Sequence, residues 1–340
     1  MSQVQNGNAS QSEYAVEISN LNVKYVTSDA VVHAVNGIDL QLKRGTILGL
    51  VGETGAGKTT TVLSLLRLIP APPGVVNADY VRVNGMDVLS MSDSQLEKFR
   101  GKEIAMIFQD PMTSLNPVMR VGDQIAESIL LHQKVNKRQA AAAAGEMLKT
   151  VGIDPARARE YPHQFSGGMR QRVGIAIALA CKPSVLIADE PTTALDVTIQ
   201  AQVLKLTKEL KQQYNTSMIL ITHDLGVVAK MCDEVAIMYA GEIVEQGTLE
   251  QVFRKTLHPY TEGLFDSLPN IRSRVNRLKP IRGLMPDPSN LPNGCAFAPR
   301  CPYACPQCAE RKPARLEMPD GHLVKCSRYA EPNFSIERRR

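Results

Sequence analysis

The stretch Ile47-Leu-Gly-Leu-Val51-Gly-Glu-Thr-Gly-Ala-Gly-Lys58-Thr59 decides how this chain of 340 residues folds. Its first five residues form a short apolar run, which predicts a buried strand of a parallel sheet. The residues from Gly52 to Thr59 fit the pattern G-x-x-x-x-G-K-[ST], and a helical pattern begins near Lys58. Since this motif requires a strand before it and a helix after it, the stretch predicts a phosphate-binding loop within an α/β fold.

The loop residues have separate tasks in binding a phosphate chain. Glycines let the backbone curl so that its N–H groups point inward at phosphate oxygens, and the following helix adds its positive end. We expect Lys58 to bridge the outer phosphates and the Thr59 hydroxyl to bind Mg²⁺. The alternative is a chance glycine-rich turn, which the flanking pattern disfavours. The predicted nucleotide-binding residues of the loop are Gly52, Glu53, Thr54, Gly55, Ala56, Gly57, Lys58, Thr59 and Thr60.

A second apolar run, Val185-Leu-Ile-Ala-Asp189-Glu190, predicts another buried strand with two carboxylates at its carboxyl end. Ligands of open α/β sheets bind at that end of the strands. We expect Asp189 to hold Mg²⁺, through water, and Glu190 to polarise the attacking water as a general base. Two adjacent acids could instead only cap the next helix, but the phosphate loop makes that the minor interpretation.

The remaining sequence predicts the surroundings of these two strands. Residues 14–42 alternate apolar and polar side chains, as in antiparallel strands with one wet face. Residues 121–151 are richly helical and predict a helical insertion between sheet elements. Strand and helix patterns then alternate, which predicts a parallel sheet covered on both faces. The predicted strands are 104–108, 185–188, 218–221 and 234–239, and the predicted helices are 168–180, 195–214 and 225–231.

Composition and charge exclude several classes of protein. With 44% hydrophobic and 21% charged residues the chain is not globally disordered. Its most apolar stretch, 175–188, is interrupted by Lys182 and Pro183, so no membrane span is predicted. Residues 1–13 are polar and lack a secretory signal, so we expect a cytoplasmic protein. The basic excess, 39 residues against 34 acidic ones, is spread along the chain, and no nucleic-acid partner is expected.

The segment Phe165-Ser-Gly-Gly-Met-Arg-Gln-Arg172 precedes the acidic strand by a short helix, and here the sequence resembles an ABC-type ATPase over about residues 14–265. The resemblance implies ATP as the nucleotide and Tyr25 as the aromatic that stacks on adenine. It implies that Gln109 senses the metal and the γ-phosphate and that His223 contacts the γ-phosphate. The catalytic residues it implies are Lys58, Gln109, Glu190 and His223, and the Mg²⁺ ligands are Thr59, Gln109 and Asp189.

Ser166, Gly167 and Gly168 stand at a predicted helix start, where a hydroxyl, unpaired N–H groups and the positive dipole end offer a second phosphate site. One chain cannot easily aim both phosphate sites at a single γ-phosphate. The resemblance therefore implies two chains that face head to tail, with ATP between them. Ser166, Gly167, Gly168 and Asp196 of the loop 193–196 would then act on the neighbouring chain's site. The alternative is a plain helix start.

Three segments, Gln109-Asp-Pro-Met-Thr-Ser-Leu-Asn-Pro117, Tyr161-Pro-His-Gln and Leu257-His-Pro-Tyr260, are similar to the oligopeptide/dipeptide importer ATPases, whose relatives also carry nickel. This resemblance implies a peripheral subunit on the cytoplasmic face of the inner membrane of a prokaryote. Its implied partners are a second ATPase subunit, as a sister chain in a heterodimer, two transmembrane permease subunits and, indirectly, an extracytoplasmic solute-binding protein. Residues 109–117 would grip a permease helix.

Two rival functions stay open at this point. A soluble ABC ATPase that assists assembly or repair would share the ATP site but have no membrane partner. A phosphate-loop kinase acting on a small molecule would not explain residues 165–172.

Five of the seven cysteines, Cys295, Cys301, Cys305, Cys308 and Cys326, crowd into one segment near the C-terminus. In a reducing compartment such a cluster suggests a metal rather than disulfides. Resemblance to the C-terminal region of the peptide importers selects Cys295, Cys301, Cys308 and Cys326 as ligands of a [4Fe–4S] cluster. Zinc is the alternative, since Cys305-x-x-Cys308 has zinc-ribbon spacing. The spacing 301–305–308 also matches enzymes that cleave adenosylmethionine, but no barrel accompanies it.

Together these predictions give an α/β fold. A phosphate-loop ABC ATPase core, with a mostly parallel sheet, an antiparallel N-terminal subdomain and a helical insertion, is followed by a small cysteine-rich metal-binding module. The predicted boundaries are 14–268 for the ATPase domain, about 110–182 for its helical subdomain and 269–340 for the C-terminal module.

Overall fold

A large mixed sheet contains both apolar runs, residues 47–51 and 185–189. The computed structural model describes residues 12–192, 195–267, 280–331 and 334–336. The order of strands in this sheet is β12-β13-β11-β10-β3-β9-β8-β7, and the run from β10 to β7 is parallel. All residues of β3, β8 and β9 are buried, as expected for strands covered on both faces. Its longer strands are β3 (Ile47–Val51), β7 (Ile104–Ile107), at the edge, β8 (Val185–Asp189), β9 (Ser217–Ile221), β10 (Glu234–Tyr239) and β11 (Glu242–Thr248).

A second, antiparallel sheet lies against the first. Its order is β2-β1-β5-β6, with β4 also paired to β1, which confirms the antiparallel strands predicted for 14–42. Helix α1 (Lys58–Leu65) packs against this sheet, and one apolar core joins Val16 and Leu40 to Leu48 and Ile219 of the large sheet. The strands are β1 (Tyr14–Val26), β2 (Val31–Lys43), β4 (Gly74–Asn77), β5 (Tyr80–Val83) and β6 (Met86–Asp87); η1 (Val88–Ser90) and α2 (Asp93–Phe99) follow.

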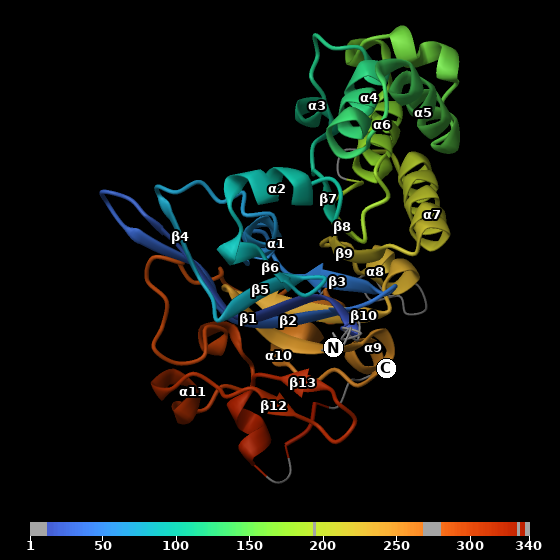
Figure 1. Cartoon of the computed structure of the whole chain (residues 1–340). Coiled ribbons are helices and arrows are strands. Elements are labelled where there is room, and N and C mark those ends of the chain that lie inside the picture. Colours follow the sequence, from blue (N-terminus) through green and yellow to red (C-terminus); the bar gives the residue numbers. More distant parts are fainter. Residues whose placement is uncertain (1–11, 193–194, 268–279, 332–333, 337–340) are drawn as a thin grey trace, which may run out of the picture.

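The predicted helical insertion forms a lobe between β7 and β8, at the top of Figure 1. Its apolar side chains, including Ile125, Ile129, Leu148 and Val173, join a core that continues into the large sheet. The predicted helical stretch 121–151 is two helices, because the chain turns before Asn136, which caps the second of them. The lobe contains α3 (Pro111–Ser114), α4 (Val121–His132), α5 (Lys137–Thr150), η2 (Pro155–Arg159), η3 (Pro162–Gln164) and α6 (Gly167–Leu179).

The helices that follow β8 confirm the alternation expected from the sequence. They are α7 (Val197–Tyr214), α8 (Leu225–Met231), α9 (Leu249–Arg254) and α10 (Pro259–Asp266). Strand β11 was missed by the sequence analysis. It forms a hairpin with β10 through Ala240 and Gly241, whose φ angles of 46° and 81° are those of a type I′ turn. In the described part of the chain, every helix is too short or too polar to cross a lipid bilayer.

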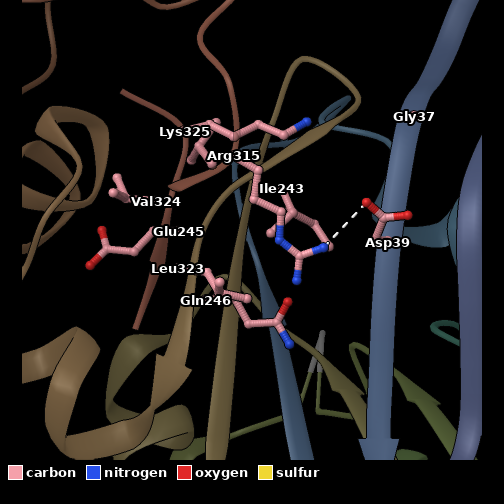
Figure 2. Close-up of a pocket in the computed structure, with 10 residues that line it drawn as sticks. Gly37, Asp39, Ile243, Glu245, Gln246, Arg315, Leu323, Val324 and Lys325 are labelled. Atoms are coloured by element: carbon pink, nitrogen blue, oxygen red, sulfur yellow. Dashed lines mark hydrogen bonds and ion pairs between the residues drawn. The ribbon is translucent and has the colours of Figure 1, made fainter. Parts of the chain in front are cut away.

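The C-terminal region extends the large sheet. Strand β13 (Leu323–Val324) pairs with β11, and β12 (Leu316–Glu317) pairs with β13. Figure 2 shows this edge, where Arg315 forms an ion pair of 3.2 Å with Asp39 of β2. The predicted domain boundary at 268/269 lies outside the described residues. The other elements here are η4 (Ala298–Arg300), α11 (Pro306–Glu310) and η5 (Ser327–Ala330).

Glu245 of β11 connects this region to the rest of the sheet. Its side chain and that of His322 are fully buried, with 3.0 Å between Glu245 Oε1 and His322 Nε2. The carboxylate accepts hydrogen bonds from the N–H groups of Leu257, at 2.8 Å, and His258, at 2.9 Å. Carboxylate oxygens accept hydrogen bonds, so this side chain suits a place where two backbone N–H groups converge.

His258 is buried beside this carboxylate and begins α10. Its Nδ1 accepts the N–H of Tyr260 at 3.1 Å, and its ring also hydrogen-bonds the backbone of Lys325. Burial lowers the pKa of His258 to about 3, so the imidazole is neutral at pH 7. The ring therefore acts as a neutral acceptor that caps a helix.

This burial predicts a loss of stability in mild acid. In the unfolded chain the pKa of histidine is about 6.5, so the unfolded state takes up a proton that the folded state excludes as the pH falls. From pH 7 to pH 5 we expect this group to lower the free energy of unfolding by about 2 kcal/mol. The variant His258→Asn, which keeps a capping acceptor, should lack this loss. Urea unfolding at pH 7, 6 and 5 measures the difference, and parallel profiles for the two proteins would contradict it.

Candidate functional site

The phosphate loop joins the carboxyl end of β3 to the start of α1. Gly57 caps α1 with a φ of 98°, and a Cβ atom there would lie 2.3 Å from the carbonyl oxygen of Ala34. A Cβ atom on Gly52 would lie 2.2 Å from the carbonyl oxygen of Met238. Both contacts are too short for any side chain, so the curl of the loop needs glycine at its first position and before its lysine.

Lys58 extends back from α1 into the loop. Its Nζ donates hydrogen bonds to the carbonyl oxygens of Gly52, at 2.8 Å, and Glu53, at 2.9 Å. Burial lowers the pKa of Lys58, and the charges of Glu190, Asp189 and Glu53 oppose that shift. The ammonium group therefore lies inside the loop and beside the carboxylates of β8.

Thr59 and Asp189 meet as the sequence analysis expected of Mg²⁺ ligands. The Thr59 hydroxyl donates a hydrogen bond of 3.0 Å to Asp189 Oδ2. Among the described residues, the buried Asp189 Oδ1 has no hydrogen-bond partner. Burial raises the pKa of Asp189, whereas the bond from Thr59 lowers it. A buried carboxylate oxygen without a partner beside a hydroxyl suits Mg²⁺, which takes oxygen ligands and usually binds one or two carboxylates.

Glu190 lies at the end of β8 with both carboxylate oxygens engaged. Gln109 Nε2 donates to Oε2 at 3.0 Å, and His223 Nδ1 lies 3.3 Å from Oε1. The side chain of Glu190 is 14% exposed and that of His223 is 68% exposed, so the site opens to solvent on the histidine side. The backbone of Glu190 has a φ of 44°, rare for a residue other than glycine, as often found at functional sites.

The structure thus brings together six residues that the sequence analysis singled out. They lie at or just after the carboxyl ends of β3, β7, β8 and β9. The carboxyl ends of parallel strands meet at one edge of a sheet, so residues far apart in the sequence come together there. These residues are Lys58, Thr59, Gln109, Asp189, Glu190 and His223.

Tyr25, the expected adenine contact, lies on β1. It pairs there with Val32 and Gly74, and its partly buried ring packs against the core between the sheets.

The signature residues form a separate group at the start of α6. Ser166 caps this helix, and its hydroxyl accepts the N–H of Met169 at 3.4 Å. A Cβ atom on Gly168 would lie 2.5 Å from Ile199 of α7, whose N–H is accepted by the capping Asp196. Helix α6 contacts α3, α4, α5, α7 and β7, whereas α1 contacts β1, β2 and β5. The two predicted phosphate sites therefore have different neighbours; residues 193 and 194 lie outside the described part.

Two residues that contact the phosphate loop, Tyr260 and Arg300, were given no role by the sequence. Arg300 forms a double ion pair with Glu53 of the phosphate loop, and the Tyr260 hydroxyl accepts the N–H of Glu53 at 3.0 Å. Tyr260 belongs to the His-Pro-Tyr segment that resembles the peptide importers, but this resemblance does not indicate a contact with the phosphate loop. Arg300 carried no signal other than its place before Cys301.

The cysteines of the C-terminal region lie near one another. Cys295, Cys301, Cys308 and Cys326 are close enough for their charges to interact, and burial raises the pKa of Cys301 to about 12 and of Cys326 to about 11. Cys305 Sγ lies 3.4 Å from Cys308 Sγ. Within the described residues, no three histidine, cysteine or acidic side chains form a metal-binding group. The metal-binding part of the predicted module is therefore not confirmed.

Comparison with solved structures places the described fold among ATP-binding cassettes. The ATP-binding cassette MJ0796, in a dimeric post-hydrolysis state bound to ADP and phosphate, matches with a TM-score of 0.62 and 25% sequence identity. The match covers 69% of this chain and 98% of that one. CbiO1 from Clostridium perfringens, part of the ABC transporter complex CbiONQ, matches with a TM-score of 0.61 and 28% identity, covering 71% of this chain and 91% of that chain.

Sequence comparison agrees over almost the whole chain. The ABC transporter family matches residues 35–193, and the family of the oligopeptide/dipeptide transporter C-terminal region matches residues 244–308. The oligopeptide transport ATP-binding protein AppD of Bacillus subtilis is 47% identical, over 93% of this chain and 97% of its own length. The dipeptide transport ATP-binding protein DppD of the same organism is 46% identical, over 92% and 94%. The chain therefore belongs to the ABC transporter family, among the oligopeptide and dipeptide transport ATP-binding proteins.

Proposed function

We propose that this chain hydrolyses ATP to power the import of oligopeptides or dipeptides through an ABC transporter. The observation that carries the ATPase part is the pairing of Thr59 with Asp189 beside Glu190, which Gln109 and His223 hold by both oxygens. The names of the curated relatives support peptide transport. A soluble assembly or repair factor is less favoured, because those relatives match this chain over more than nine-tenths of its length.

Each residue of the site has a task that its contacts support. Lys58 would exchange its loop carbonyl bonds for phosphate oxygens, and the loop N–H groups would hold the same phosphates. Thr59 and Asp189, with Gln109, would hold Mg²⁺, which neutralises phosphate charge when bound. Glu190 would accept the proton of the attacking water while Gln109 and His223 orient its carboxylate.

The second predicted phosphate site, at the start of α6, supports the proposal that the chain works with a second ATPase subunit. Ser166, Gly167 and Gly168 would contact the γ-phosphate held by a second ATPase subunit, with Asp196 at the shared boundary. A sister chain is the proposed partner, and a second copy of this chain is the alternative. One of the similar solved structures is described as dimeric.

The remaining proposed partners belong to the membrane. Two permease subunits would bind near residues 109–117, and a solute-binding protein would deliver the peptide from outside. Phe108 and Val118, which flank that segment, are 46% and 80% exposed. These two side chains would form part of the docking surface, and the proposed contact with the permeases would place the chain on the cytoplasmic face of the inner membrane.

The cysteines add a proposed metal centre. Cys295, Cys301, Cys308 and Cys326 would hold a [4Fe–4S] cluster, with zinc as the alternative. Cysteine sulfur is the ligand type that both kinds of centre take, and this chemistry supports the proposal. A metal here would stabilise a region with few regular elements.

Substitution of Glu190 tests the catalytic assignment. We expect Glu190→Gln to bind ATP as the unaltered protein does and to hydrolyse it at least about 100-fold more slowly, because the amide cannot accept the proton of water. Equilibrium binding of ATP and release of phosphate measure the two effects. Glu209→Gln, on the exposed face of α7, is the matched control and should hydrolyse ATP normally. Near-normal turnover by Glu190→Gln would contradict the role of Glu190.

Purification from membranes tests the proposed transport role. We expect the chain to be recovered from detergent-solubilised membranes together with two hydrophobic subunits. Val118→Asp should weaken this recovery several-fold, because it places a charge on the proposed docking surface. Met86→Asp, on an exposed edge strand of the other sheet, should not. Recovery of the chain without hydrophobic subunits would favour the soluble alternative.

Metal analysis tests the cysteine centre. Anaerobically purified protein should contain iron and acid-labile sulfide, with visible absorbance that is lost in Cys295→Ala. Cys181→Ala, a lone thiol in the helical lobe, should keep both. Zinc without iron would favour the alternative metal, and an unchanged metal content in Cys295→Ala would remove this residue from the ligand set.

A further inference from the structure

The phosphate loop is attached to the C-terminal region by one well-formed ion pair. Arg300 Nη1 lies 3.0 Å from Glu53 Oε2, and Nη2 lies 3.2 Å from Oε1, so the guanidinium and the carboxylate form a bidentate pair of hydrogen bonds. The side chain of Arg300 is 7% exposed and that of Glu53 is 31% exposed. Paired geometry of this kind is stronger and more directional than a single contact, and burial protects it from screening by salt.

Arg300 is itself held rigidly. Its Nε donates to the carbonyl oxygen of Arg282 at 3.0 Å, and Nη1 also donates to the Tyr239 hydroxyl at 3.3 Å. The guanidinium lies within 6.0 Å of the ring centroids of Tyr239 and Phe297. A side chain fixed on several sides loses little further freedom in binding Glu53, so it can fix the position of its partner.

Glu53 passes this constraint to the site. Its N–H donates to the Tyr260 hydroxyl, and its carbonyl oxygen accepts a hydrogen bond from Lys58 Nζ. Met285 also contacts the loop, since its Cε lies 3.1 Å from the position of a Cβ atom on Gly55. A shift of Glu53 would therefore move the loop backbone, whose N–H groups are the proposed phosphate ligands, together with the carbonyl that holds Lys58 before nucleotide binds. Without Arg300, the Glu53 carboxylate would also carry an unpaired negative charge close to a binding site for anions.

We propose that Arg300 is a positioning residue for nucleotide binding, which acts by holding the Glu53 carboxylate away from the phosphates and fixing the backbone of the loop. This inference rests on the proposed function, because it assumes that the loop binds ATP. It gives the C-terminal region control of nucleotide affinity through Glu53.

The effect of Arg300 is measured by binding of a fluorescent N-methylanthraniloyl ATP with Mg²⁺ to the full chain. Binding is measured in the Glu190→Gln background, which prevents hydrolysis. We expect Arg300→Ala to raise the dissociation constant about tenfold, equivalent to about 1.4 kcal/mol, with Arg300→Lys in between. In otherwise unaltered protein, Arg300→Ala should raise KM for ATP and leave kcat within about threefold. Arg315→Ala, which breaks the ion pair with Asp39 in the same region, is the matched control and should bind as the parent does.

A double substitution tests whether Arg300 acts through Glu53. In a Glu53→Gln background there is no carboxylate to hold, so Arg300→Ala should raise the dissociation constant by less than about twofold. An equal rise in both backgrounds would overturn the proposal, as would an equal rise in Arg315→Ala or a fall in kcat at unchanged affinity. If Arg300→Ala does not fold, as judged by thermal unfolding, the same comparison is made with Arg300→Lys. Failure of the parent to bind the nucleotide would instead overturn the proposed function.

Discussion

The rest of the structure depends on one constraint, which is that the backbone N–H groups of a single loop must converge on a small volume. Carbonyl oxygens of Ala34 and Met238 lie where side chains on Gly57 and Gly52 would be, so the loop can curl only with glycine there. The buried strand β3 fixes the start of the loop, and α1 fixes its end. Two sheets then enclose α1 in a common core, so the loop is held between elements that cannot shift independently.

The sequence predicted the central strands well because each contains a short apolar run with distinct limits. Residues 47–51 and 185–189 are buried along their whole length, and apolar runs this short favour a buried strand over a helix. Strand β11 was missed, since its type I′ turn uses Ala240-Gly241 in place of the usual Asn-Gly or Asp-Gly. Strands β12 and β13 have two residues each, too few to show any periodicity.

The same distinction applies to the site. Asp189 and Glu190 could be predicted because they end an apolar run, and parallel strands bring such ends to one edge. Arg300 lies 247 positions from Glu53 and belongs to no motif of its own, so nothing local in the sequence links the two. The hydrogen bonds from Lys58 to the loop carbonyls could not be predicted either. A motif specifies which residue is present but not which atoms its side chain binds.

The contacts of Glu245 limit how far the chain can be shortened from its C-terminal side. One buried carboxylate gathers a histidine from the C-terminal strands and two N–H groups from the start of α10. A fragment that ended before residue 322 would keep the acid but lose the imidazole and the strand that cover it, and water would reach the edge of the large sheet. Minimal versions of this ATPase for crystallisation or fusion should therefore retain residues 280–330, although the nucleotide motifs end far earlier.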